Sequence, residues 1–187
     1  FDPDGTFFKD RTEIANNNLT DSNNIFALTR VAGGDDSYTK FLYHLDNAVT
    51  DSSGGRHTLT NSNVTFSTTY KKFGTHGAVF NGTTAYLYVA DHADADLSGG
   101  TWTIDAWVYV SSLAAVNPIY YQNTTNDNDS FKVYIDTDGS VKILVKASSS
   151  PVVEIYSPAS VIQKGKWQHV ECGESGNTWY IFVDGVL

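Results

Sequence analysis

The residues best suited to bind a ligand alternate along one predicted strand. From Trp102 to Val110 the chain reads WTIDAWVYV, so Asp105, Trp107 and Tyr109 fall on one side and mainly aliphatic residues on the other. Aromatic rings stack on the apolar faces of sugar rings, while carboxylates take the hydroxyl groups. Tyr134, from a similar alternation in the next sheet segment, joins these three residues in a candidate glycan site. The alternative is that these rings are buried beneath loops, as large aromatic side chains often are.

Paired carboxylates, which glycoside hydrolysis requires, are scarce. A retaining mechanism needs two carboxyl groups about 5 Å apart, and alternate residues of a strand supply that spacing. Asp136 and Asp138 have the spacing, but they adjoin Gly139, where a role in a hairpin turn is sufficient. These two carboxylates therefore do not predict a hydrolase.

Other catalytic and metal-binding signatures are weak. The chain has no G-x-S-x-G sequence, and Cys172 lies in a strand pattern where it serves as a small hydrophobic residue. His44, His57, His76 and His92 are too scattered in the sequence to predict a metal site. Acidic loops offer the oxygen ligands that calcium prefers, although ordinary solvated turns have the same composition.

Composition restricts the partners. The 187 residues contain 21 acidic and 12 basic side chains, for a formal net charge of −9. Because this balance offers no clustered positive field, we expect neither nucleic acid nor an anionic membrane surface as a partner. The single cysteine excludes an internal disulfide and a cysteine-based zinc cluster. The absence of a long apolar run predicts no membrane insertion.

Short apolar runs separated by turns predict an all-β fold from Tyr38 onward, and Asp138-Gly139 between two of them is a strong hairpin signal. Residues 1–36 lack such a period and are rich in Asn, Asp and Gly, so we expect an extended arm or linker ahead of a domain over residues 37–187. The expected strands cover residues 41–46, 57–60, 64–67, 78–80, 85–90, 102–110, 118–122, 131–136, 141–146, 152–156, 167–172 and 179–184.

Six strings, in order over most of the chain, resemble the laminin-G-like branch of the concanavalin A-like lectin/glucanase superfamily. The resemblance implies a jelly-roll sandwich of two antiparallel sheets, one of them concave. The Tyr-Thr-Lys start of the first string is most similar to copies found in bacteriophage virion proteins such as tail or head fibres. The strings are YTKFLYHLDN (38–47), DSSGGRHTLT (51–60), KKFGTHGAVFNGTTAYLYVAD (71–91), GGTWTIDAWVYV (99–110), GKWQHVEC (165–172) and WYIFVDGVL (179–187).

The same resemblance bears on chemistry and completeness. Glucanases of the superfamily carry their carboxylates as Glu-x-Asp-x-Glu or Glu-x-Asp-x-x-Glu, and none of the four Glu residues here begins such a motif. Many laminin-G-like domains hold one calcium ion, and by resemblance Asp46 and Asp51 are its candidate ligands. The family pattern continues for two or three strands after VDGVL, so we expect a jelly roll whose C-terminal strands are missing or supplied by another chain.

The sequence therefore predicts a non-enzymatic structural and adhesion protein, located on a virion or otherwise extracellular. Its lectin-like domain would bind cell-surface polysaccharide weakly and in many copies, which converts modest affinity into avidity. The arm would contact other copies of the chain or other virion proteins. Two alternatives stay open: a purely architectural protein that decorates or cements a capsid or filament, and a glycoside hydrolase of the glucanase branch.

Overall fold

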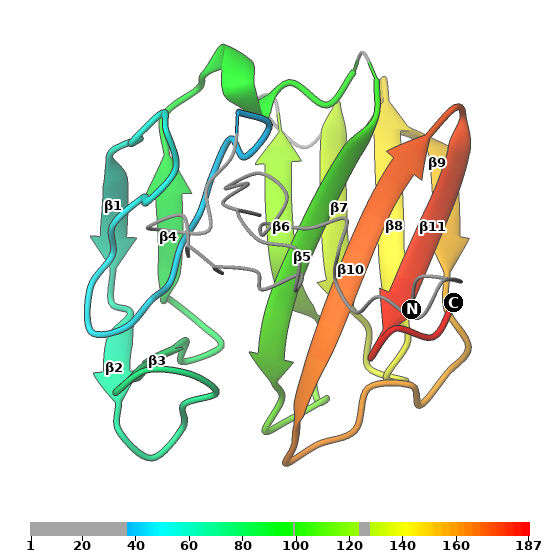
Figure 1. Cartoon of the computed structure of the whole chain (residues 1–187). Helices are drawn as coiled ribbons and strands as arrows, with labels where there is room; N and C mark the ends of the chain where they lie inside the picture. Colours follow the sequence, from blue (N-terminus) through cyan, green and yellow to red (C-terminus); the bar gives the residue numbers. More distant parts are fainter. Residues whose placement is uncertain (1–36, 99, 124–127) are drawn as a thin grey trace, which may run out of the picture.

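Strands account for nearly all of the regular structure in the part of the chain that the computed structural model describes, which is residues 37–98, 100–123 and 128–187. The predicted arm, residues 1–36, lies outside the described residues. The elements, drawn in Figure 1, are β1 (Leu59–Ser62), β2 (Thr65–Ser67), β3 (Gly77–Val79), β4 (Tyr86–Val89), the short 3-10 helix η1 (Ala93–Ala95), β5 (Trp102–Tyr109), β6 (Asn117–Asn123), β7 (Ser130–Ile135), β8 (Val141–Ala147), β9 (Ser150–Tyr156), β10 (Trp167–Ser175) and β11 (Thr178–Val183).

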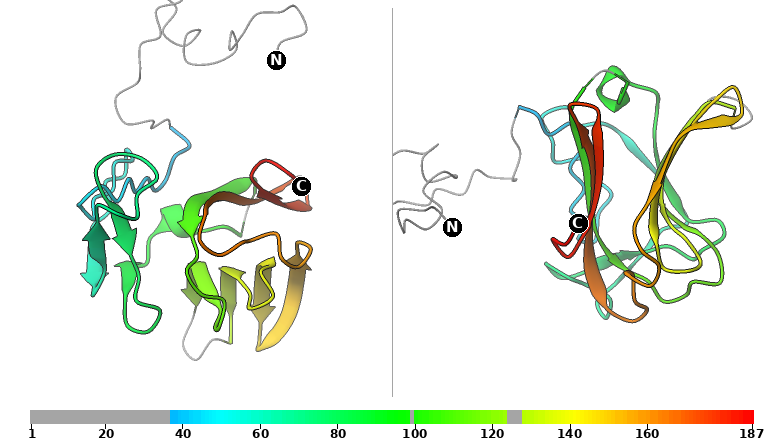
Figure 2. Two further views of the ribbon diagram at one scale, coloured as in Figure 1. Left: turned by 90° about the horizontal axis from the view of Figure 1, so that it is seen from below. Right: turned by 90° about the vertical axis from the view of Figure 1, so that its right-hand side faces the viewer.

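Two antiparallel sheets form the sandwich. One sheet has the strand order β11-β10-β5, and the other has the order β6-β7-β8-β9. The right-hand view of Figure 2 shows them nearly edge-on as two separate layers. The short pairs β1–β4 and β2–β3 lie to one side of these layers, at the left of Figure 1. The predicted all-β sandwich of antiparallel sheets is confirmed.

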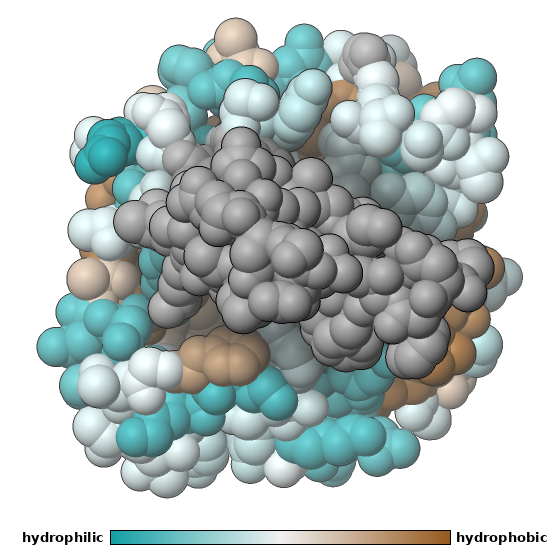
Figure 3. All heavy atoms as spheres, viewed as in Figure 1, coloured by the Kyte–Doolittle hydropathy of each residue, from teal (hydrophilic) through white to brown (hydrophobic). Residues whose placement is uncertain are grey.

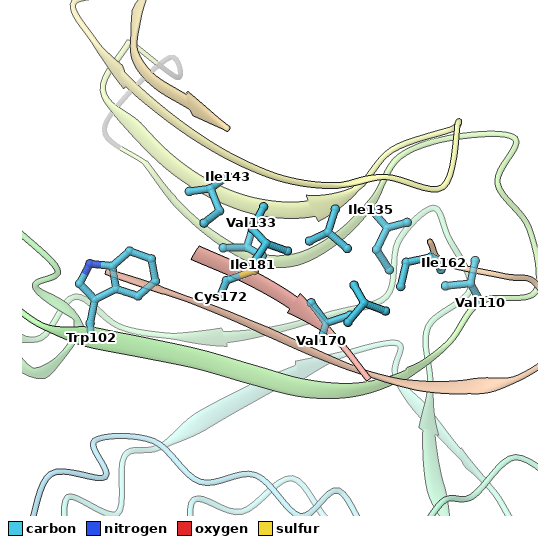
Figure 4. Packing of buried hydrophobic residues seen from close by; sticks show 11 residues of the cluster. Trp102, Val110, Val133, Ile135, Ile143, Ile162, Val170, Cys172 and Ile181 are labelled. Atoms are coloured by element: carbon cyan, nitrogen blue, oxygen red, sulfur yellow. The ribbon is translucent and has the colours of Figure 1, made fainter. Parts of the chain in front are cut away.

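Alternation along the strands places the core between the two layers. On β5, Trp102, Ile104 and Val108 face inward and pack in the cluster that Val110 completes just beyond the strand. The partner sheet contributes fully buried aliphatic residues, and Figure 4 shows these side chains pointing at one another from both layers. The cluster of buried residues consists of Trp102, Val110, Val133, Ile135, Val141, Ile143, Ile162, Val170, Cys172, Ile181 and Val183.

The hairpin between β7 and β8 forms at the predicted Asp138-Gly139 turn. Gly139 has a φ of 79°, and its N–H donates to the carbonyl of Asp136 at 3.0 Å. The Asp138 carboxylate accepts hydrogen bonds from the backbone N–H of Ser140 (2.9 Å) and from its hydroxyl (2.6 Å). A side chain at Gly139 would meet the carbonyl oxygen of Ile162 at 2.8 Å, so glycine is required both by the turn and by the neighbouring loop.

The expected strand over residues 41–46 does not form, which corrects the sequence prediction. The segment makes a single isolated bridge, between Tyr43 and Asp51. Leu45 has a φ of 54°, which interrupts an extended backbone. In place of a strand ladder, the Asp51 carboxylate accepts hydrogen bonds from the backbone N–H groups of Leu42 (3.0 Å), Ser53 (2.9 Å) and His57 (2.9 Å).

Cys172 reports on the integrity of the core. It pairs with Ile104 of β5 and Ile181 of β11 and is fully buried, and this burial together with the negative charge of Glu171 raises the pKa of its thiol to about 12. Since the thiolate is the reactive species, we expect Cys172 to resist alkylation at pH 8 in the native protein and to react only with the unfolded chain. Labelling followed by mass spectrometry across a urea series should match the unfolding curve; rapid labelling without denaturant would contradict the core described here.

Candidate functional site

The outer face of the β11-β10-β5 sheet carries the aromatic and polar residues that the inner face excludes. The pairing of β5 with β10 sets Trp107 opposite His169, Asp105 opposite Glu171, and Tyr109 opposite Trp167. We call the surface formed by these six residues the Trp107 face. Trp107 itself is 40% exposed at the middle of β5. Figure 3 views the molecule from this side, where the surface around the grey atoms is mainly hydrophilic with a few hydrophobic patches.

The loop between β2 and β3 packs against the Trp107 face. The ring of Phe73 meets Trp107 edge-on, with 5.7 Å between centroids, and the Lys72 ammonium lies 4.0 Å from the centre of the Trp107 ring. The ring of Tyr70 contacts that of Tyr109 in a tilted arrangement, with 5.2 Å between centroids. Phe73 is well exposed, so two accessible rings at right angles and one cation lie together on this surface.

The carboxylate of Asp46 holds this loop in place. Its Oδ1 accepts hydrogen bonds from the backbone N–H and the hydroxyl of Thr75, at 2.9 and 2.7 Å, and from the backbone N–H of His76 at 2.7 Å. Gly74, with a φ of 64°, lets the chain approach this carboxylate where a side chain would clash with it. The Thr75 hydrogen bonds, joined by that of His76, hold the pKa of Asp46 below its usual value.

Charged groups lie beside the rings. The side chain of Asp105 is 62% exposed, and its Oδ1 lies 3.5 Å from Nε2 of His169. Glu171 is directly opposite Asp105 on the neighbouring strand, a position that brings Cβ atoms to about 4.5–5.5 Å. The Trp107 face therefore offers two carboxylates, an imidazole and an ammonium around an exposed indole.

The structure brings together three of the four predicted glycan-site residues and separates the fourth. Asp105 and Trp107 are exposed on the Trp107 face, and Tyr109 is partly covered there by Tyr70 and Trp167. Tyr134 lies between the buried residues Val133 and Ile135 on β7, so its side chain points away from the sandwich on the other sheet. The four residues therefore do not share one surface, because strand alternation identifies a face of a sheet but not which sheet carries it. Glycan binding by these residues stays a prediction.

Several exposed residues, most of them aromatic, were not identified as site residues from the sequence. Lys72 and Phe73 belong to a loop without periodicity, so only their contacts with Trp107 identify them. Tyr86 and Tyr88 lie on the same side of β4, and each is more than half exposed. The alternation in AYLYVA was the signal that could have identified this second aromatic pair.

The candidate calcium ligands have another structural role. Asp46 anchors the 70–77 loop, and Asp51 anchors the 42–57 segment through its three amide hydrogen bonds. Calcium binding by Asp46 and Asp51 stays a prediction. A different group of side chains meets the geometric requirements for a metal ion among the described residues, namely His57, His92 and Asp94. The two histidines, which are far apart in sequence, were not expected to meet.

Two open pockets of the described structure lie away from the Trp107 face. Both pockets lie beside η1, one lined by Asp91, His92, Ala93, Asp96 and Gln122 and the other continuing toward Trp102. The Trp107 face is thus the surface of a sheet that a ligand would approach from above.

No helix in the described part of the chain is both long and apolar enough to cross a membrane.

The fold agrees with that of a known family. A family model of the laminin G type, described as the concanavalin A-like lectin/glucanases superfamily, matches residues 81–187, which is more than half of the chain. The chain therefore belongs to the concanavalin A-like lectin/glucanase superfamily. The match begins just before β4 and includes all strands of the sandwich.

Two solved structures are similar to the chain at low identity. One is part of an S-layer domain-containing protein from Clostridium thermocellum, with 20% identity and a TM-score of 0.46; the match covers 79% of this chain and 66% of that one, just under two thirds. The other is the carbohydrate-binding module CBM66 from Bacillus subtilis, with 14% identity and a TM-score of 0.42, covering 79% of this chain and 80% of that one. No curated protein matches the chain.

Replacing Asp51 by Asn tests its anchoring role. Burial raises the pKa of Asp51, but the hydrogen bonds from the backbone amides of Leu42, Ser53 and His57 lower this pKa by more. The pKa of Asp51 therefore lies below its usual value. A lowered folded-state pKa adds stability above the unfolded-state pKa of about 3.9, and this stability is lost as the pH falls through the folded-state pKa. We expect Asp51→Asn to lower the free energy of unfolding at pH 7 by about 1–3 kcal/mol. Asparagine keeps one acceptor oxygen without the negative charge and replaces the other by an NH₂ donor, so at least one partly buried amide loses its acceptor.

The measurement is urea unfolding of both proteins from pH 7 to pH 3. The difference between wild type and Asp51→Asn should shrink on the acid side of this range. Asp105→Asn, at an exposed site, is the matched control and should change stability by no more than about 0.5 kcal/mol. Equal stabilities at pH 7, or a difference that does not depend on pH, would show that Asp51 is not an anchor.

Proposed function

We propose that this chain is a non-enzymatic carbohydrate-binding domain that uses the Trp107 face. The observation that carries the proposal is the exposure of Trp107, at 40%, in the middle of a strand whose opposite face builds the core. A large apolar ring kept in contact with water on a rigid sheet is preorganised for stacking on a sugar. Membership in a superfamily of lectins and glucanases supports the same class of ligand.

The neighbours of Trp107 define how a sugar would be held. Lys72 occupies part of the ring surface, while Phe73 rises beside it and extends the apolar platform. Asp105 and His169 lie on the same face, where they can accept and donate hydrogen bonds to sugar hydroxyls. One stacking platform with a few polar contacts gives weak binding, so display in many copies supplies the avidity.

A hydrolase is the second candidate, and it rests on the pairing of Asp105 with Glu171. Their cross-strand positions approach the separation of about 5 Å that retaining glycosidases use. A glycosidase also needs one carboxyl group protonated at neutral pH, which enzymes achieve by burying it. The side chain of Asp105 is 62% exposed and so lacks this burial. We therefore favour binding without hydrolysis.

The proposal also includes the location of the chain and its partners. We assign the chain to an extracellular structure, and to a bacteriophage virion in particular, where it would contact bacterial surface polysaccharide. The support is the similarity of the string at residues 38–47 to copies in virion proteins. Residues 1–36, which lie outside the described residues, would join the domain to other copies of the chain or to other virion proteins.

The substitution Trp107→Ala tests the binding surface. We expect the full chain, displayed multivalently on beads, to bind a subset of bacterial surface polysaccharides on a glycan array. Trp107→Ala should weaken that binding about ten-fold or more, as loss of a central tryptophan does in other interfaces. Tyr121→Ala is the matched control, since Tyr121 is 48% exposed with Lys132 4.8 Å from its ring but lies on the opposite sheet.

Other outcomes would either contradict the Trp107 face as the binding site or identify a competing function. Equal binding by wild type and Trp107→Ala would overturn the Trp107 face as the site. Release of reducing sugar by the wild type, abolished in Glu171→Gln, would establish the hydrolase instead. A silent array, together with retained assembly into particles, would establish an architectural protein that decorates or cements a capsid or filament.

Calcium binding is a separate proposal that concerns Asp46 and Asp51. The three hydrogen bonds described for Asp46 all end on Oδ1, and Oδ2 is an oxygen of the kind that calcium binds. Ca²⁺ added to metal-free protein should then raise the melting temperature, and Asp46→Asn should remove this response. A melting temperature that is the same with calcium and with a calcium-selective chelator would eliminate the proposal.

A further inference from the structure

Three side chains from distant parts of the sequence meet next to η1. His57 ends the segment that Asp51 anchors, while His92 and Asp94 belong to the turn that begins η1. Nε2 of His57 lies 3.1 Å from Oδ2 of Asp94, and Nδ1 of His92 lies 3.4 Å from the same oxygen. One nitrogen or oxygen from each of the three residues lies within 4.8 Å of the other two. Figure 1 shows the start of the described chain, in blue, directly beneath η1.

These distances fit a tetrahedral metal ion. Zinc binds histidine nitrogen and carboxylate oxygen at about 2.0–2.2 Å, which places two ligand atoms of a tetrahedron about 3.3 Å apart. The two distances to the Asp94 oxygen lie on either side of that value. Two imidazoles and one carboxylate form a donor set typical of zinc and other divalent transition ions, whereas calcium and magnesium select oxygen ligands.

The surrounding structure holds the ring of His57 in place. The side chain of His57 is 8% exposed and is packed between Phe41, at 4.6 Å between ring centroids, and His92, at 4.4 Å. Gly55 leaves the space that the ring fills, because a side chain there would come within 2.5 Å of Nε2. The backbone N–H of His57 is fixed by Asp51. A ligand that is positioned in advance loses little freedom when the ion binds.

The protonation states of the cluster are compatible with ion binding. The Asp94 backbone N–H donates to Nδ1 of His92, so this nitrogen has a lone pair that an ion could bind only by displacing that N–H. An ionised Asp94 can only accept, so its hydrogen bond with His57 requires a proton on Nε2. Binding of an ion at Nε2 requires the other neutral tautomer of His57, in which the single ring proton lies on Nδ1 and the Nε2 lone pair faces the ion. Lys40 lies 3.6 Å from the other oxygen of Asp94, and its side chain is exposed and can turn away.

We propose that His57, His92 and Asp94 form a binding site for one divalent transition-metal ion, represented here by Zn²⁺. The side chain of His92 is 50% exposed and lines an open pocket, which gives the ion a path from solvent and leaves room for water as a fourth ligand. The ion joins the 40–57 segment to η1. This site shares no residue with the Trp107 face, and its ligands differ from the candidate calcium ligands Asp46 and Asp51, although Asp51 holds the backbone of His57.

Calorimetric titration of the tag-free full chain with ZnCl₂ tests the site. We expect one Zn²⁺ per chain, a rise in melting temperature on binding, and visible absorption typical of tetrahedral Co²⁺ when cobalt replaces zinc. His92→Ala and Asp94→Asn should each weaken Zn²⁺ binding at least about ten-fold. His92 is the first choice because its exposed ring can be removed with little effect on folding, which thermal unfolding without metal will verify.

Two further variants make the test specific. His76→Ala is the matched control, because His76 also lies beside an aspartate, with Nδ1 3.9 Å from Oδ1 of Asp46, and this variant should bind Zn²⁺ as the wild type does. Gly55→Ala keeps all three ligands but places a methyl group against the His57 ring, so it should also weaken binding. Failure of the wild type to bind Zn²⁺, equal binding by His92→Ala, or unchanged binding by Gly55→Ala would overturn the proposal.

Discussion

The pairing of β5 with β10 is the constraint on which the rest of the structure depends. Eight consecutive residue pairs fix the register, from Trp102 with Glu174 to Tyr109 with Trp167. Because side chains alternate across a strand, a slip of one residue would exchange the two faces of β5 and expose Val108 while burying Asp105. The burial of an unpaired carboxylate and the loss of core contacts make that register unfavourable. The same pairing therefore determines both the core and the Trp107 face.

Much of the fold could be predicted because its signals are local. The alternation in WTIDAWVYV identified the inward and outward residues of β5, and the Asp138-Gly139 pair identified the β7–β8 hairpin. The 41–46 segment failed for the opposite reason. Its sequence resembles that of a strand, but the backbone amide of Leu42 donates to the side chain of Asp51 and not to a neighbouring strand. A side-chain acceptor that takes the place of a neighbouring strand does not change the periodicity of the segment's own sequence.

The candidate sites were harder to predict because they combine residues that are distant in sequence. Asp105 and Glu171 become neighbours only through the strand register. Lys72 reaches Trp107 only because Asp46 holds the 70–77 loop, to which Lys72 belongs. His57 and His92 meet because two separate turns end at the same place. Spacing along one chain cannot reveal such contacts. A residue type and its face were predictable here, whereas its partners across the fold were not.

The excess of aspartate over glutamate has a structural cause. Asp46, Asp51, Asp138 and Asp184 each accept hydrogen bonds from backbone amides. Asp51 and Asp138 reach amides two residues away within turns, which suits a short side chain, whereas Asp46 and Asp184 bind amides 30 and 15 residues away in the sequence. Much of the negative charge is thus committed to holding loops in place and does not form a ligand field. Asp94 differs, since its carboxylate meets two imidazoles. Asp105 differs as well, because it remains exposed beside Trp107. Asp94 and Asp105 therefore direct carboxylate oxygens toward side chains or solvent, in contrast to the aspartates whose oxygens are bound to backbone amides.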